Sequence, residues 1–576
     1  MGNCLVSHFF DPPASFIINK GVSKFEKIVV TSALPYANGE IHLGHIASTY
    51  LPADILVRFF RLRKNDVVFT CATDDFGTPI LIEAEKEGKS PKDFVKHWHE
   101  LDAKDFEDLG ISFDMFGQTS SDENVKLAQH FFRKLNEGGY IFKESILQPY
   151  CENDKKFLPD RYIKGTCPYC GATDQYSDGC EKCGRILQPG EIIDPHCAIC
   201  GSKPTNKQSD HYFFALSSFS DALKKWLIEN EKLQSEIKNY VLKWIEDGLK
   251  NWDITRDISW GVPIPLEEAK GKVLYGWFDN HLGYISTTLR YLSEKETDGK
   301  EFWNSSKIYH FIGKDIVYHH YLFLPAMRLG VEEFKLPEYV PTRGHLMLQG
   351  QKFSKSRGWY ISLRGFLNQF PADYLRYYLA VITPFDQSDV NFNWEDFRSR
   401  INNELIAKIG NFIHRALSFT WSNYGGKVPE PKGYDELDRE FEEKIKAISL
   451  EVGSEIEKNE LSRGLRKILE FAACCNQYFQ RKQPWTNKEK AGTCLFLCVN
   501  AARSLAVLLE PYMPFSAESL WKQLNLQGSI DEEGWDSASY LMIQGGHQIN
   551  EPKVLFKIVQ PEEVKKEKEK LLGTSQ

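Results

Sequence analysis

Three C-x-x-C pairs lie between residues 167 and 200, and their spacing restricts the fold more than any other feature. The pairs begin at Cys167, Cys180 and Cys197, and another cysteine, Cys151, precedes them. Paired cysteines at this spacing bind zinc through thiolates, and the N-terminus has no basic start that would indicate a signal peptide. We therefore predict a segment whose fold is held together by bound zinc, in a protein of a reducing compartment, the cytoplasm. The other six of the 13 cysteines are interpreted as buried thiols.

The sequence around this segment alternates strands and helices. The apolar run 27–32 predicts a buried strand, which a loop follows before a helix opens at residues 44–46. A second strand at 66–71 and helices within 90–137 complete the alternation that is typical of a parallel α/β sheet. Further strands are predicted at 273–278 and 308–312, after a helical stretch at 219–252. An insert therefore splits the sheet domain.

The C-terminal part is predicted to be wholly helical. Apolar residues recur there at intervals of three and four, and the connections are short and polar. This pattern indicates a helical bundle. The predicted helices are 394–424, 434–458, 461–482, 489–510 and 515–525.

Composition limits the classes of partner. A chain of 576 residues suggests two to four domains. No run of about 18 apolar residues was found, so we expect no membrane span. The formal net charge of -8 argues against nonspecific binding to nucleic acid, but it allows a locally basic RNA site.

Two short motifs, far apart in the chain, have side chains suited to phosphate chemistry. His42-Leu43-Gly44-His45 lies at a strand-to-helix turn, where a helix N-terminus favours anions. Lys352-Phe353-Ser354-Lys355-Ser356 follows the Gly350 turn, and its two lysines could stabilise charge that develops on phosphorus. Either motif alone could be an ordinary surface segment. Together they indicate an enzyme that activates a substrate with ATP.

The order and separation of these motifs resemble the HIGH and KMSKS signatures of class I aminoacyl-tRNA synthetases. Neighbouring segments narrow the resemblance to the methionyl-tRNA synthetase family, over about residues 25–550. These segments are Ala33-Leu34-Pro35-Tyr36-Ala37-Asn38-Gly39, Phe157-Leu158-Pro159-Asp160-Arg161-Tyr162, Trp277-Phe278-Asp279 and Phe311-Ile312-Gly313-Lys314-Asp315-Ile316-Val317.

The resemblance implies a two-step reaction, in which methionine and ATP give methionyl-adenylate and the methionyl group then passes to the 3' end of tRNA(Met), initiator or elongator. It implies that His42, His45, Lys352 and Lys355 are catalytic and bind ATP, that Gly313 and Asp315 hold the ribose, and that Mg²⁺ accompanies the ATP. The implied methionine-binding residues are Leu34, Tyr36, Asp74, Arg256, Trp277, Tyr284, Ile316 and His320.

The methionine pocket departs from the family pattern at several positions. Asn280-His281 stands where many members have Ala-Pro, Leu324 replaces a tryptophan that is common in bacterial members, and Phe76 stands where His or Tyr is usual. Lineage drift is the favoured explanation of these changes, because Asp74, Trp277 and Tyr284 remain. An altered side-chain pocket is the alternative, and it would affect selection against analogues such as norleucine.

The resemblance also assigns the cysteines and the RNA-reading residues. Cys167, Cys170, Cys180 and Cys183 are expected to form one structural four-thiolate zinc site. A second site could use Cys151, Asp154, Cys197 and Cys200 with the carboxylate as a ligand, or it could be weak or empty. Asn411, Arg415 and Trp485 match the anticodon-reading residues of the family.

The expected fold class is α/β, with a Rossmann-like parallel sheet split by a zinc-binding insert and followed by a helical anticodon-binding domain, in a monomer. The expected units are an N-terminal extension without fixed structure (1–24), the first half of the catalytic domain (25–140), the connective insert (141–254), the second half (255–340), the lysine-loop and stem-contact region (341–392), the anticodon domain (393–548) and a tail (549–576).

Three other interpretations are disfavoured or excluded by the sequence. A synthetase for Ile, Val or Leu would need a large editing insert that 576 residues cannot hold, and the Trp277-Phe278-Asp279 context does not fit these enzymes or the enzyme for Cys. A catalytically idle, RNA-binding paralogue is disfavoured by the intact His and Lys motifs. A zinc-ribbon module alone is excluded by the split sheet domain around the cysteines.

Overall fold

A five-stranded parallel sheet lies at the centre of the N-terminal part of the protein. In the computed structural model, which describes residues 25–177, 180, 182–183, 185, 187, 191–355, 358–486 and 491–573, the strand order is β14-β13-β1-β2-β3. The strands are β1 (Lys27–Ser32), β2 (Asp66–Thr73), β3 (Met115–Gln118), β13 (Lys307–Gly313) and β14 (Thr342–Arg343). The predicted parallel sheet is thus confirmed. The extension predicted for residues 1–24 lies outside the described residues.

The central strand β1 contacts a different hydrophobic core on each of its faces, because successive side chains of a strand point to opposite sides. Ile28 and Val30 pack in one core with α2 (Leu51–Leu62) and α4 (Pro91–Leu109). Val29 packs in the other with α5 (Asp122–Glu137), α9 (Leu282–Glu294) and α11 (Leu324–Val331). Helices therefore cover both faces of the sheet, as expected for strands that are buried on both sides.

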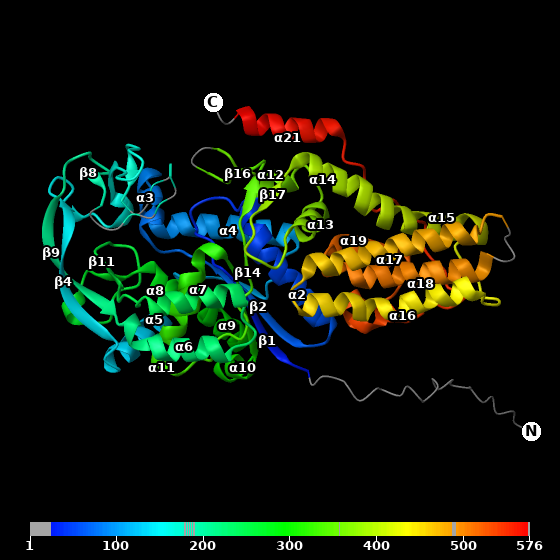
Figure 1. Cartoon of the computed structure of the whole chain (residues 1–576), viewed down its shortest axis with the longest axis horizontal. Helices are drawn as coiled ribbons and strands as arrows, with labels where there is room; N and C mark the ends of the chain where they lie inside the picture. The colour runs from blue at the N-terminus through cyan, green and yellow to red at the C-terminus, as the bar shows by residue number, and fades with distance from the viewer. Residues whose placement is uncertain are drawn as a thin grey trace, which may run out of the picture.

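The cysteine-rich segment lies at the end of a long antiparallel arm. β4 (Ile141–Cys151) and β9 (Thr205–Phe214) pair from Ile141↔Phe214 to Tyr150↔Thr205, and the segment between them folds at the edge of the molecule farthest from the helical bundle (Figure 1). The chain returns through α6 (Ser220–Glu229) and α7 (Ser235–Glu246), which pack in the same core as α11.

One predicted strand is partly wrong. The run 273–278 forms β12 only at Val273–Leu274, and α8 (Gly276–Asn280) follows it. The backbone N–H of Tyr275 still bonds to the Ile254 carbonyl, so the chain leaves the ladder directly after this residue. Short apolar runs fit a strand or a buried helix equally well.

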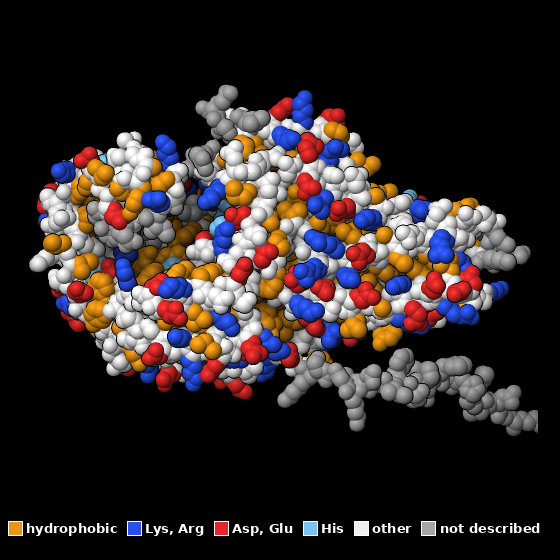
Figure 2. Space-filling model, in the orientation of Figure 1, with side chains coloured by type: hydrophobic (Ala, Val, Ile, Leu, Met, Phe, Trp, Pro, Cys, Tyr) orange, Lys and Arg blue, Asp and Glu red, His pale blue; other side chains and the backbone are white. Residues whose placement is uncertain are grey.

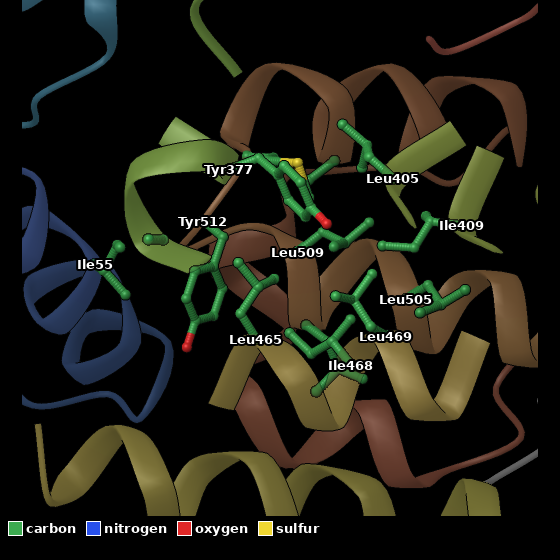
Figure 3. Packing of buried hydrophobic residues seen from close by; sticks show 14 of the residues in the cluster. Ile55, Tyr377, Leu405, Ile409, Leu465, Ile468, Leu469, Leu505, Leu509 and Tyr512 are labelled. Atoms are coloured by element: carbon green, nitrogen blue, oxygen red, sulfur yellow. The ribbon is translucent and has the colours of Figure 1, made fainter. Parts of the chain in front are cut away.

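The C-terminal part is a bundle of long helices, as predicted. α14 (Trp394–Arg400) continues through a helical stretch at 401–410 into α15, and α16–α19 follow. Leu405 and Ile409 meet leucines of α17 and α18 in the bundle core, which Ile55 of α2 and Tyr377 of α13 also enter (Figure 3). The bounds are α13 (Ala372–Ile382), α15 (Asn411–Tyr424), α16 (Glu436–Glu457), α17 (Leu461–Lys482), α18 (Ala491–Leu509) and α19 (Pro514–Gln523).

By length and composition, α18 could cross a membrane, but 94% of its apolar window is buried inside the protein. It is therefore interpreted as the core helix of the bundle.

A buried ionic network joins the bundle to the sheet domain. Arg376 of α13 donates to Asp54 of α2 over 2.6 Å and to the carbonyls of Pro511 and Tyr512 over 2.9 Å each. Asp54 also accepts from Arg58, which reaches Glu510 on the other side. Arg376 and Asp54 are fully buried, so this network fixes how the two parts meet.

Candidate active site and metal centre

The histidine motif and the lysine motif meet in one cavity, although about three hundred residues separate them in the sequence. The ring of Phe353, between the two lysines, stacks on His42 with 5.0 Å between ring centroids. A side chain on Gly39 would lie 3.1 Å from Nζ of Lys355, so the glycine allows the lysine to approach the histidine loop. Ser356 lies outside the described residues.

Both histidines lie where β1 ends and the first helix starts. The ring of His42 stacks on that of His45, with centroids 3.6 Å apart. Nδ1 of His42 accepts from the N–H of Gly44, and Nδ1 of His45 accepts from the N–H of His42. Because each Nδ1 is an acceptor, the ring proton of each neutral imidazole is on Nε2.

The two imidazoles are neutral. Burial, together with the positive charge of Lys355, lowers the pKa of His42 to about 3. Burial, His42 and Lys355 likewise lower the pKa of His45 well below its usual value. Both rings can therefore offer uncharged N–H donors, while Lys355 supplies positive charge beside them.

The cavity has a volume of about 450 Å³, within the usual range for a small-molecule site. It opens at the carboxyl ends of β1 and β13, where ligands of open parallel sheets bind. Figure 2 shows a hollow between the cysteine-rich segment and the sheet domain, with hydrophobic and histidine side chains visible in it. The predicted site residues that line the cavity are His42, His45, Lys352, Gly313, Asp315, Leu34, Tyr36, Trp277, Tyr284, Ile316 and His320.

Three predicted residues lie beside this cavity rather than in its wall. Lys355 lines a neighbouring surface pocket with Tyr360. Arg256 lines a second hollow that shares Tyr36 and Trp277 with the cavity, and its guanidinium lies 3.9 Å from the ring centre of Tyr275. Asp74 is buried and accepts a hydrogen bond from Asn280, which does line the cavity.

Tyr284 and His320 form a defined pair in the apolar part of the cavity. Nδ1 of His320 lies 3.0 Å from the Ile316 carbonyl, which can only accept, so Nδ1 carries the proton. The Tyr284 hydroxyl, 2.8 Å from Nε2, therefore donates to His320. Burial lowers the pKa of His320 to about 4, so the ring is neutral.

Sequence reasoning assigns no role of their own to two residues of this site. Phe353 is only part of its motif, and Asn280 is only a departure from the family pattern. Asn280 lines the cavity and donates to Asp74 over 2.6 Å. Residues 206 positions apart leave no local pattern that predicts such a contact.

The four cysteines of the predicted zinc site are brought together. The sulfur atoms of Cys167 and Cys183 are 3.9 Å apart, and those of Cys170 and Cys180 are 3.5 Å apart. A tetrahedral zinc with bonds of about 2.3 Å separates its sulfur ligands by about 3.8 Å. The donor set therefore fits a structural zinc.

The second predicted group also converges. One Asp154 oxygen lies 3.1 Å from the sulfur atoms of both Cys151 and Cys197, and Cys200 lies 3.5 Å from Cys151. The Ser202 hydroxyl is within hydrogen-bonding distance of Cys151 and Cys200. Three thiolates and one carboxylate, all within 4.8 Å of one another, could hold a metal ion.

The predicted anticodon residues share one region of the bundle. Arg415 donates to Gln480 and lies 5.0 Å from the ring centre of Phe479, which the Trp485 ring approaches within 5.9 Å. Asn411 is exposed one helical turn before Arg415 on α15. Trp485 is 43% exposed, which is unusual for so large an apolar side chain.

A parallel sheet whose carboxyl ends bring a histidine turn and a lysine loop to one cavity, with a helical bundle behind it, defines a class I aminoacyl-tRNA synthetase. A sequence-family model for "tRNA synthetases class I (M)" matches residues 28–417, and one for the anticodon-binding domain of tRNA ligases matches residues 438–571.

Similar proteins indicate the family within this class of synthetases. The chain is 43% identical to the methionine–tRNA ligase of Methanopyrus kandleri over 94% of this chain and 81% of the relative. It is 44% identical to that of Pyrococcus abyssi over 93% and 76%, respectively. The crystal structure of Mycobacterium tuberculosis methionyl-tRNA synthetase bound by methionyl-adenylate shares the fold, with a TM-score of 0.77 at 23% identity over 92% of this chain and 100% of that one. The chain belongs to the methionyl-tRNA synthetase family.

Proposed function

We propose that the protein is a methionine–tRNA ligase, which activates methionine with ATP and then transfers the methionyl group to tRNA(Met). The observation that carries this proposal is the contact between His42 and Phe353, because it joins the two phosphate-handling motifs at one cavity. Family membership and the methionine–tRNA ligase relatives support the same activity.

In the activation step, the methionine carboxylate attacks the α-phosphorus of ATP. A carboxylate–phosphorus bond forms, the bond from the α-phosphorus to the bridging oxygen breaks, and pyrophosphate leaves with the electron pair. The carboxylate is already ionised, so the step needs positioning and charge stabilisation rather than a general base. The Nε2–H groups of His42 and His45 would donate to phosphate oxygens, and Lys352 and Lys355 would neutralise the departing pyrophosphate.

Gly313 and Asp315 line the cavity at the end of β13, and we assign them to the ATP ribose. Mg²⁺ would accompany the triphosphate and screen its charge.

Methionine would lie between the apolar wall and the buried acid. Leu34, Trp277 and Ile316 provide apolar surface in the cavity, and the Tyr284–His320 pair lines the same apolar part. The α-ammonium would face Asp74 and Tyr36. Arg256 would act at the carboxylate end.

For the transfer step we propose that the helical bundle reads the anticodon through Asn411, Arg415 and Trp485. An exposed tryptophan beside an arginine can stack on an unpaired base. The exposed position of Trp485 supports this assignment, as does the approach of both Trp485 and Arg415 to the ring of Phe479.

We propose two structural zinc ions, one at the four-thiolate group and one at the group with Asp154. Both donor sets converge, and the Ser202 hydroxyl beside two of the sulfur atoms would stabilise thiolates at the second site. The thiolates of these groups are compatible with the reducing cytoplasm, which we propose as the location. We propose that the protein acts as a monomer, which light scattering would test. We also propose the domain limits that were expected from the sequence.

Methionine-dependent exchange of pyrophosphate into ATP tests the activity. The wild-type protein should support exchange with methionine and not with isoleucine, valine, leucine or cysteine. Replacing Lys355 with Ala should reduce exchange by at least a hundredfold, whereas replacing the exposed Lys565 of the C-terminal helix should leave it unchanged. A folded wild-type protein without exchange would establish the idle-paralogue interpretation.

A further inference from the structure

Asn280 joins the last turn of α8 to the end of β2. Its side chain is only 4% exposed and lines the cavity, and its Nδ2 donates to Oδ2 of Asp74 over 2.6 Å. Asp74 directly follows the last residue of β2. The contact therefore fixes a carboxylate at the sheet edge against a helix that also presents Trp277 to the cavity.

This contact is the main restraint on the Asp74 side chain. The backbone of Asp74 is held by bonds to the Pro35 carbonyl and from the Ala37 N–H, so its Cα position is fixed. Among the residues that the structure describes, the carboxylate receives only a long 3.4 Å bond from the Phe76 N–H to Oδ1 besides the bond from Asn280. Asn280 thus fixes one oxygen and leaves the other with unused acceptor capacity.

The surroundings of Asp74 contain acids but no paired base. Asp75 and Asp279 are also fully buried, and the negative charge of Asp74 raises the pKa of Asp279, Tyr36 and Tyr284 further beyond the effect of their burial. Among the ion pairs of the described residues, no lysine or arginine bonds to Asp74. A buried carboxylate is stable only with a counter-charge or hydrogen bonds, so this group of acids suits a cationic ligand.

We propose that Asn280 is a positioning residue, whose amide favours the ionised form of the Asp74 carboxyl group and orients it for the α-ammonium group of the amino-acid substrate. This inference rests on the proposed function, and it gives a role to a residue that stands where many family members have alanine. The amide acts through Asp74, because its donor already bonds to the carboxylate.

The tests use Asn280→Ala and the isosteric Asn280→Asp in the full-length protein. With methionine, Asn280→Ala should raise KM ten- to a hundredfold, the range for loss of one hydrogen bond to a charged group. The kcat and the KM for ATP should change less than threefold. Asn280→Asp keeps the shape but removes the donor and adds an acid, so its KM should rise at least as much.

A methionine analogue without the amino group, 4-(methylthio)butanoate, separates positioning from general damage. It has no ammonium for Asp74 to bind, so its inhibition constant should be the same for wild type and Asn280→Ala. Asn124→Ala is the matched control, because this buried asparagine also bonds to α8, through the Asp279 carbonyl, but does not contact Asp74. Any loss it causes should affect methionine and the analogue equally.

The pH profile gives a second readout. Loss of the amide donor favours the protonated carboxyl, so the pH below which KM for methionine rises should be higher in Asn280→Ala than in wild type. An unchanged KM and pH profile in both variants, or equal losses for methionine and the analogue, would overturn the inference. Wild-type protein that neither binds nor activates methionine would overturn the proposed function and the inference together, whereas an active wild type with normal variants overturns the inference alone.

Discussion

The buried network around Arg376 allows a quantitative prediction about how the two parts of the protein are joined. In Arg376→Met, an apolar side chain of similar length replaces the guanidinium. Asp54 then loses the bond of 2.6 Å, and the carbonyls of Pro511 and Tyr512 lose their donor. Arg58 still pairs with Asp54 over 2.9 Å, so the carboxylate keeps one counter-charge.

The magnitude follows from the type of interaction. Breaking a buried ion pair by removing one partner costs about 3–5 kcal/mol, and the remaining Arg58 places this case near 3 kcal/mol. The pKa of Asp54 supports this scale. Burial alone would raise it, but Arg58 and Arg376 together with Ser112 lower it to about 2. A lowering of this size from the usual value corresponds to roughly 2 kcal/mol of stability near neutral pH.

Thermal unfolding measures the effect. For a cooperative unit of about 250 residues, a loss of about 3 kcal/mol in the free energy of unfolding lowers the unfolding temperature by about 6 °C. The stabilisation from Asp54 is present above its unfolded-state pKa near 4 and is lost as the pH falls toward 2, so the gap between variant and wild type should narrow below pH 4. Arg290→Met, which removes an exposed pair with Glu294, is the control and should change stability by about 0.5 kcal/mol or less.

Equal unfolding temperatures for wild type and Arg376→Met at neutral pH would refute this reasoning. A loss of stability in Arg290→Met as large as that in Arg376→Met would also refute it, because an exposed ion pair would then contribute as much as a buried one.

Other measurements address the site. Trp485→Ala should reduce aminoacylation of tRNA by roughly 5- to 150-fold, the equivalent of one base stack, and leave pyrophosphate exchange intact; equal loss of both would exclude anticodon reading. Burial, with Asp75 alongside, raises the pKa of Asp74 to about 8 even with its hydrogen bonds, so KM for methionine should rise about tenfold per unit as pH falls below 8; a constant KM from pH 6 to 9 would contradict this. Metal analysis should find two zinc ions per chain, and one in Cys180→Ser or in Asp154→Ala; an active, metal-free protein would reject both sites.

The sequence predicted the elements with a strong periodic pattern. The buried strand at 27–32 and the bundle helices match the structure closely, because their hydrophobic spacing is set by the core that they face. The run 273–278 was misassigned after Leu274, since its aromatic residues face a core from a helix as readily as from a strand.

The same limit applies to the site. The meeting of His42 with the lysine loop was predictable from two recognisable motifs. The bond between Asn280 and Asp74 was not predictable. The sheet edge and α8 are brought together only by tertiary folding, and the local sequence around either residue does not indicate a contact with the other.

The position of β1 has a consequence for biosynthesis. This strand pairs with β2 on one side and with β13 on the other, and Ile28 is matched to Lys307. At translation rates of about 5–20 residues per second, the ribosome needs roughly 14–56 s to make the 279 residues between these two positions. During that interval one edge of β1 has no partner strand, and the cysteine arm that interrupts the domain is completed before the interval ends. An unpaired apolar strand can associate with other chains, so the nascent protein should depend on chaperones until β13 emerges.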